Sequence, residues 1–131
     1  MRKTLLFALL FLLALSQAVP AQRQGVRINR VEMSAPWSGF YYQGQGQQLW
    51  AKAVVSNTSS TPLRGATLRF EFFDPIGPRE SFDVPLPIIA PGGVTSVDSP
   101  QWWDYSGAEI GCKALIFDQN GDALATGQTG R

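Results

Sequence analysis

The chain has 131 residues, a formal net charge of +1 at pH 7, no histidine and a single cysteine. Without histidine, the chain lacks the commonest general base and metal ligand, so the usual centres of hydrolases and metalloenzymes are excluded. A nearly neutral chain also disfavours binding to nucleic acid and to anionic membranes, which both require clustered basic residues.

The first 21 residues have the order of a secretory signal peptide: a positive start, an apolar run over 5–15, and small residues up to Ala21. As a helix the run is about 17 Å long, too short for the ~30 Å hydrocarbon core of a bilayer. We expect cleavage after Ala21, with Ala18 as the alternative. This predicts an exported protein, in the periplasm, on the cell surface or secreted, whose single mature domain spans 22–131 without a stable membrane span.

The mature part has no sustained helical period of apolar residues. Alternating or β-branched segments between glycine and proline turns instead predict seven strands, at 26–33, 49–56, 66–74, 82–86, 94–97, 109–117 and 122–127. A change of phase within the first strand suggests a bulge near Arg30. Pro85 and Pro87 confine the fourth strand to a sheet edge. Seven strands at this spacing predict an all-β, immunoglobulin- or fibronectin-like sandwich.

Strict alternation predicts which side chains enter the core. The inward positions are Leu49, Ala51, Ala53 and Val55, then Ala66, Leu68, Phe70 and Phe72, and finally Ile110, Cys112, Ala114 and Ile116. Lys52 marks the opposite face of its strand, with Val54 and Ser56, as the solvent face. Outward apolar residues could form a patch for a partner protein if no loop covers them; they are Trp50, Val54, Phe73, Leu115 and Phe117.

The segment Phe70-Glu71-Phe72-Phe73-Asp74 resembles the signature of the FxLYD domain family. The resemblance extends over about 49–97 and includes the Pro62-Leu63 step and the turns at 74–77 and 91–93. It implies a small immunoglobulin-like sandwich found mostly outside the cytoplasm of prokaryotes, with an accessory or interaction role and no assigned chemistry. Phe72 and Phe73 replace the Leu-Tyr of the family, and no functional residues carry over.

Three polar motifs have an ordinary reading beside a functional one. Asp98, Asp104 and Glu109 could supply a glycosidase-type carboxylate pair, but exposed acids are common and a small sandwich offers little cleft. The run 118–122 has acidic spacing like a calcium loop, yet its glycine is misplaced, so a hairpin is favoured. The sequon 57–59 is a turn, and a glycosylation site only in a eukaryotic secretory pathway.

The free thiol of Cys112 shares the phase of its inward neighbours. We therefore expect a buried, inert cysteine, with an intermolecular disulfide as the alternative.

Aromatic residues are the most distinctive feature. Trp37, Phe40, Tyr41 and Tyr42 fall in a Gly- and Gln-rich connection over 34–48, and Trp102, Trp103 and Tyr105 fall in a second irregular stretch. Exposed rings would serve a ligand or partner surface, because stacking combines contact area with a polar rim. The alternative is that these rings close the open ends of the sandwich.

Together these observations predict a non-enzymatic exported accessory or protein-interaction domain without cofactor or metal. Its partner would be another envelope or secreted protein. The alternative is a carbohydrate-binding module that stacks polysaccharide on Trp37, Tyr41, Trp102 or Trp103.

Overall fold

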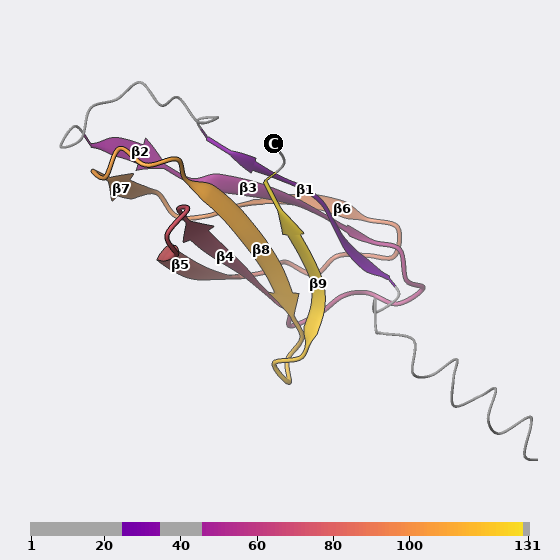
Figure 1. Cartoon of the computed structure of the whole chain (residues 1–131). Helices are drawn as coiled ribbons and strands as arrows, with labels where there is room; N and C mark the ends of the chain where they lie inside the picture. Colours follow the sequence, from indigo (N-terminus) through magenta and orange to yellow (C-terminus); the bar gives the residue numbers. More distant parts are fainter. Residues whose placement is uncertain (1–24, 35–45, 130–131) are drawn as a thin grey trace, which may run out of the picture.

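The computed structural model describes residues 25–34 and 46–129, which form β-strands and no helix (Figure 1). The described part therefore contains no helix long and apolar enough to cross a membrane. The expected signal peptide and four of the expected aromatic site residues lie outside the described residues; the four are Trp37, Phe40, Tyr41 and Tyr42. The domain range 22–131 stays a prediction.

Seven longer strands make two antiparallel sheets, as an immunoglobulin- or fibronectin-like sandwich requires. The first sheet has the order β1 (Val26–Met33), β3 (Ala51–Asn57), β6 (Val94–Asp98). The second has the order β5 (Pro78–Pro85), β4 (Thr67–Phe73), β8 (Gly111–Phe117), β9 (Ala123–Gln128). The expected fold class is confirmed, and so is the edge position of β5.

The two sheets meet along β1 and β9, which lie beside each other in Figure 1. A Cβ atom on Gly127 would lie 2.8 Å from Cγ2 of Ile28, so the close approach of these strands requires glycine at this position. The ladder between β1 and β3 skips Asn29, which confirms the bulge expected near Arg30.

Two short strands were not expected. β2 (Gln47–Leu49) pairs with β7 (Trp102–Asp104) and extends the ladder of β3 and β6 toward one end of the sandwich. The expectation that Trp102 and Trp103 lie in an irregular stretch is therefore wrong.

A bulge explains why the chain resumes a strand after Pro100. Leu49 pairs with Trp102, and Lys52 pairs with Asp98. Between these pairs, two residues of one segment (50–51) lie opposite three residues of the other (99–101). Proline has no N–H for the ladder. Ser99 compensates: its N–H donates to the Ala51 carbonyl at 2.8 Å, and its Oγ accepts the Ala51 N–H at 2.9 Å.

The core follows the predicted alternation, because every inward residue of the strands at 49–56, 66–74 and 109–117 is buried. On the second sheet, large side chains lie opposite small ones. Phe70 pairs with Ala114 and Phe72 with Cys112, all without solvent exposure. Burial raises the pKa of the Cys112 thiol to about 12, so this thiol is the buried, unreactive cysteine that was expected.

Val54 and Ser56 are buried, contrary to the expectation of a solvent face. β3 is the central strand of its sheet, and Arg30 and Ser96 flank Val54 in the paired strands. The Ser56 hydroxyl donates to Oδ1 of the bulged Asn29 at 3.0 Å. Residues of the neighbouring strands thus bury part of the face of β3 that its own sequence predicts to be exposed to solvent.

The outward apolar residues do not form one patch. Val54 belongs to β3 of the first sheet and Trp50 directly precedes that strand, whereas Phe73, Leu115 and Phe117 lie on β4 and β8 of the second sheet. The Arg69 guanidinium also lies 4.9 Å from the centre of the Phe117 ring. These five residues therefore do not make one continuous apolar patch.

Adjacent phenylalanines on β4 provide a test of this packing. Phe72→Ala should lower the free energy of unfolding by about 3–5 kcal/mol, because it removes a fully buried ring from the core. The ring of Phe73 is 36% exposed. The loss of unfolding free energy in Phe73→Ala should therefore be smaller than that in Phe72→Ala by at least about 2 kcal/mol. Urea unfolding followed by tryptophan fluorescence measures both values. Equal losses for the two variants would contradict the assigned faces of β4.

Candidate binding surface at the β2 and β7 end

The turn after β4 is built around the carboxylate of Asp74. Its Oδ1 atom accepts the backbone N–H of Ile76 at 2.8 Å and of Gly77 at 2.9 Å, and its own N–H donates to the Gly77 carbonyl. These two backbone bonds, followed by the contact with Arg79, hold the pKa of Asp74 below its ordinary value. The turn between β4 and β5 is therefore fixed by a charged side chain.

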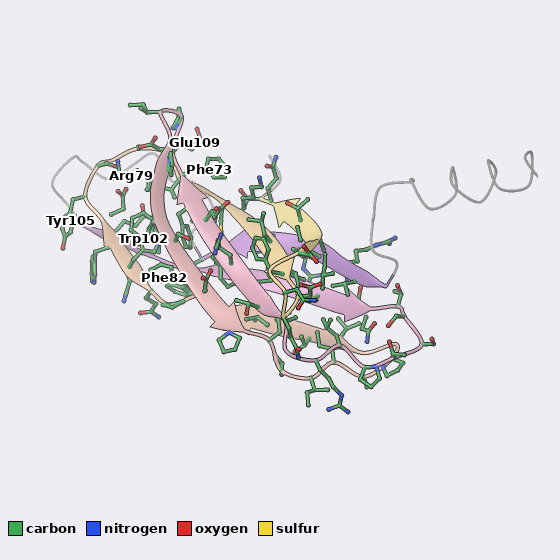
Figure 2. All side chains as sticks on the ribbon, turned by 90° about the horizontal axis from the view of Figure 1, so that it is seen from below. Phe73, Arg79, Phe82, Trp102, Tyr105 and Glu109 are labelled. Carbon is green, nitrogen blue, oxygen red and sulfur yellow. The ribbon has the colours of Figure 1, made fainter. Side chains whose placement is uncertain are left out.

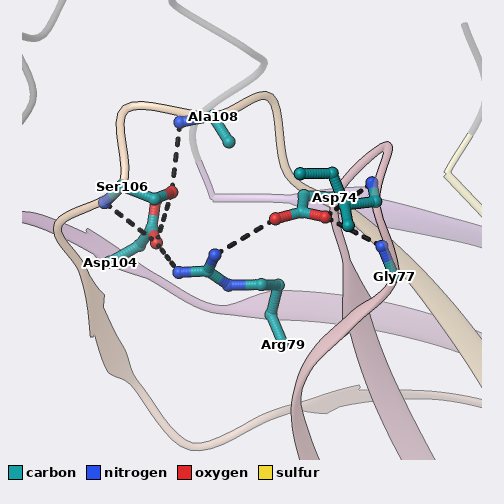
Figure 3. Close-up of polar contacts among 7 residues, drawn as sticks. Asp74, Gly77, Arg79, Asp104, Ser106 and Ala108 are labelled. Carbon is teal, nitrogen blue, oxygen red and sulfur yellow. Dashed lines mark hydrogen bonds and ion pairs between the residues drawn. The ribbon is translucent and has the colours of Figure 1, made fainter.

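Arg79 on β5 joins this turn to the end of β7 (Figure 3). Its Nη1 atom donates to Oδ2 of Asp74 at 3.1 Å, and its Nη2 atom donates to Oδ1 of Asp104 at 2.9 Å. The side chains of Asp74 and Asp104 are 6% and 0% exposed, whereas that of Arg79 is 33% exposed. We call these three residues the Arg79 bridge. One cation thus forms ion pairs with two buried carboxylates from different segments.

Asp104 also fixes the backbone that follows β7. The Ser106 hydroxyl lies 2.9 Å from each oxygen of the Asp104 carboxylate, and the Ser106 Oγ atom accepts the N–H of Ala108 at 3.1 Å. Tyr105 lies between these two anchored residues. Its backbone is therefore held in place relative to the rest of the sandwich.

Consecutive aromatic residues on β7 face opposite sides. Trp102 packs inward, with its ring 5.3 Å from that of Phe72, which in turn meets Phe82 edge-on at 6.2 Å. Its buried Nε1–H has no hydrogen-bond partner among the described residues. Trp102 closes the end of the core, which is one of the two roles that the sequence predicted for these rings (Figure 2).

Trp103 and Tyr105 face solvent, and each is 56% exposed. Their rings lie 6.4 Å apart, centre to centre, and are nearly parallel, with an angle of 22°. Figure 2 shows Tyr105 at the outer edge of the molecule. Gly46 packs against both rings, since a Cβ there would lie 2.6 Å from Tyr105 and 2.9 Å from Trp103.

Two glutamines accompany the rings. Gln48 is the ladder partner of Trp103, and its Nε2 atom donates to Oε1 of Gln101. Both glutamines are exposed. We call Gln48, Gln101, Trp103 and Tyr105 the aromatic–amide surface. It combines nearly parallel rings with amide groups and contains no charged side chain.

The carboxylates considered for catalysis have other roles or places. Asp104 is buried and engaged by Arg79 and Ser106, so it cannot serve as a solvent-accessible acid or base. Asp98 lies exposed on β6 opposite Lys52, and Glu109 precedes β8. No group of three His, Cys, Asp or Glu side chains within 25–34 and 46–129 could hold a metal ion.

The two remaining motifs are turns. Asp118 Oδ1 accepts the N–H of Asn120 and of Asp122, each at 2.9 Å, and Gly121 has a φ of 84°, as a hairpin loop requires. The side-chain amide of Asn57 is buried and donates to the Thr61 and Ile89 carbonyls, both at 2.9 Å. That nitrogen is therefore engaged within the fold.

A hollow of about 590 Å³ lies beside the turn between β4 and β5 and is lined by residues of β4, β5 and Lys113 of β8. Ile76 at the tip of this turn is 97% exposed. Sequence reasoning did not single out this region, because an apolar residue in a turn is a common feature.

No protein-family model and no curated protein matches the sequence. Among solved structures, the chain is similar to part of a Bacteroides uniformis β-glucuronidase, with a TM-score of 0.64 and 10% identity over 79% of this chain. It is also similar to part of a putative β-galactosidase from Bacteroides fragilis, with a TM-score of 0.58 and 11% identity over 79% of this chain. The chain covers 14% and 17% of these proteins. This likeness concerns the β-sandwich fold.

The charge of Asp74 gives a test by pH. Because its pKa is lower in the folded than in the unfolded state, the resulting stabilisation is complete above the ordinary value near 3.8 and is lost as pH falls through the folded value. Asp74→Asn removes this dependence. The difference in unfolding free energy between wild type and variant should shrink between about pH 5 and about pH 2, as urea titrations would measure.

Asp83→Asn is the matched control, since Asp83 pairs with Arg69 in an exposed position, where an ion pair contributes little. Its difference from wild type should stay small throughout. A constant difference between wild type and Asp74→Asn at all pH values would show that the folded turn does not depend on the Asp74 charge.

Proposed function

We propose that this chain is a non-enzymatic exported accessory domain that binds a component of the cell envelope through the aromatic–amide surface. The observation that carries the proposal is the exposure of Trp103 and Tyr105 on an anchored strand end. Large aromatic side chains in contact with solvent are a cost to a soluble domain unless a partner covers them.

The absence of an enzymatic role is supported by the residue types. The chain has no histidine, and its buried carboxylate Asp104 is fully occupied by Arg79 and Ser106. The cysteine has a raised pKa and no solvent exposure, so it cannot supply a thiolate nucleophile.

The candidate partners are a protein and a polysaccharide of the envelope. A protein partner follows from the accessory role that the sequence predicts. A polysaccharide is favoured by one specific observation, since two nearly parallel rings stand beside two exposed amides. Both partners would use the same surface.

Retention on insoluble cell envelope from candidate bacterial hosts, which contains proteins and polysaccharides together, tests the proposal. The wild-type protein should be retained, and a Trp103→Ala, Tyr105→Ala double variant should lose most of this retention. The matched control is Ile88→Ala, because Ile88 is 60% exposed in the connection between β5 and β6. Equal retention of the double variant and the wild type would refute the proposed surface.

A further inference from the structure

We infer that the aromatic–amide surface binds a neutral oligosaccharide or polysaccharide, a step that rests on the proposed function. Two features of this surface indicate the chemistry of the ligand: the arrangement of its four side chains and the absence of charge among them. The four residues are Gln48, Gln101, Trp103 and Tyr105.

The two rings suit the apolar face of a sugar. A pyranose presents C–H groups on its face, and these pack against the electron-rich face of an aromatic ring. Trp103 and Tyr105 are nearly parallel and 6.4 Å apart between ring centres. Two neighbouring rings provide more stacking area than one, so a chain of sugar units should bind more tightly than a monosaccharide.

The two amides suit the hydroxyl rim of the same sugar. The bond from Gln48 Nε2 to Gln101 Oε1 leaves the Gln48 carbonyl oxygen and the Gln101 amide nitrogen without a partner among the described residues. The first accepts a hydrogen bond and the second donates. Neighbouring sugar hydroxyls both donate and accept, so they can satisfy this pair together.

The rings and the amides are also held in place before any ligand arrives. Gly46 packs against both rings, the side-chain hydrogen bond joins the two glutamines, and the Arg79 bridge fixes Asp104 between the two aromatic residues. Such preorganisation reduces the ordering cost of binding.

The lack of charge argues against anionic ligands. Recognition of a carboxylate, sulfate or phosphate calls for Arg, Lys or several converging N–H groups. Arg79, which stabilises this end of the sandwich, is already paired with Asp74 and Asp104. The surface therefore fits an uncharged glycan.

Native affinity electrophoresis of the purified protein tests the inference. Gels contain one soluble polysaccharide each: hydroxyethylcellulose, galactomannan, xylan or glycogen as neutral probes, and polygalacturonate or hyaluronate as anionic probes. At least one neutral polysaccharide should retard the wild type. Trp103→Ala and Tyr105→Ala should each weaken the apparent affinity about tenfold, and Ile88→Ala should not change it.

A conservative variant separates lost stacking from lost folding. Trp103→Phe keeps an aromatic face and should retain more affinity than Trp103→Ala. Gln101→Leu keeps the bulk but removes the amide, and should weaken binding. Thermal unfolding of every variant should remain within a few degrees of the wild type, because Trp103 and Gln101 are exposed.

Retardation by anionic polysaccharides alone would overturn the inference, as would neutral binding that does not change in Trp103→Ala. Absence of retardation by every probe would also overturn it. If envelope retention still depends on Trp103 and Tyr105 in that case, the proposed surface stands and its partner is a protein. If envelope retention is equally insensitive, the proposed function fails as well.

Discussion

Two buried carboxylates and one arginine determine how this sandwich is closed at its β2 and β7 end. Asp74 directly follows β4 and Asp104 is the last residue of β7, and burial of either charge alone would be strongly unfavourable. Arg79 satisfies both and thereby ties a turn of the second sheet to an extension of the first. The bridge fixes Asp104, which in turn positions Ser106 and the backbone of Tyr105 between them.

The β2–β7 pair continues the first sheet because the chain forms a bulge at 99–101 and does not leave the sheet there. Pro100 removes one donor from the ladder, and Ser99 restores the connection through its hydroxyl and its N–H. Beyond the bulge, alternation sends Trp102 into the core and Trp103 to the surface. The same short strand therefore places Trp102 at the end of the core and Trp103 at the surface. Each of the two roles that the sequence left open for these rings, closing the core and facing a ligand, thus fits one of the two tryptophans.

Much of the fold could be predicted from the sequence, because alternation in strands such as 66–74 and 109–117 reports burial directly. Val54 and Ser56 were misassigned because burial in a central strand depends on its neighbours, which one strand does not reveal. The sequence predicted Trp103 and Tyr105 as surface candidates, but it did not show that Trp102 would face the core while the other two face solvent. Arg79 and Asp104 are 25 residues apart, and ordinary charged residues carry no signal that they will meet.

The Arg79 bridge holds the strand end that displays Trp103 and Tyr105, and this role can be tested. Hydrogen exchange of backbone amides in wild type and Arg79→Met tests it most directly, because methionine keeps the apolar stem without the charge. In Arg79→Met, exchange should be faster at Ile76, Gly77, Ser106 and Ala108, with protection kept at Phe70 and Ala114 in the β4–β8 ladder. Unchanged exchange at Ser106 and Ala108, or a uniform increase throughout both sheets, would contradict it.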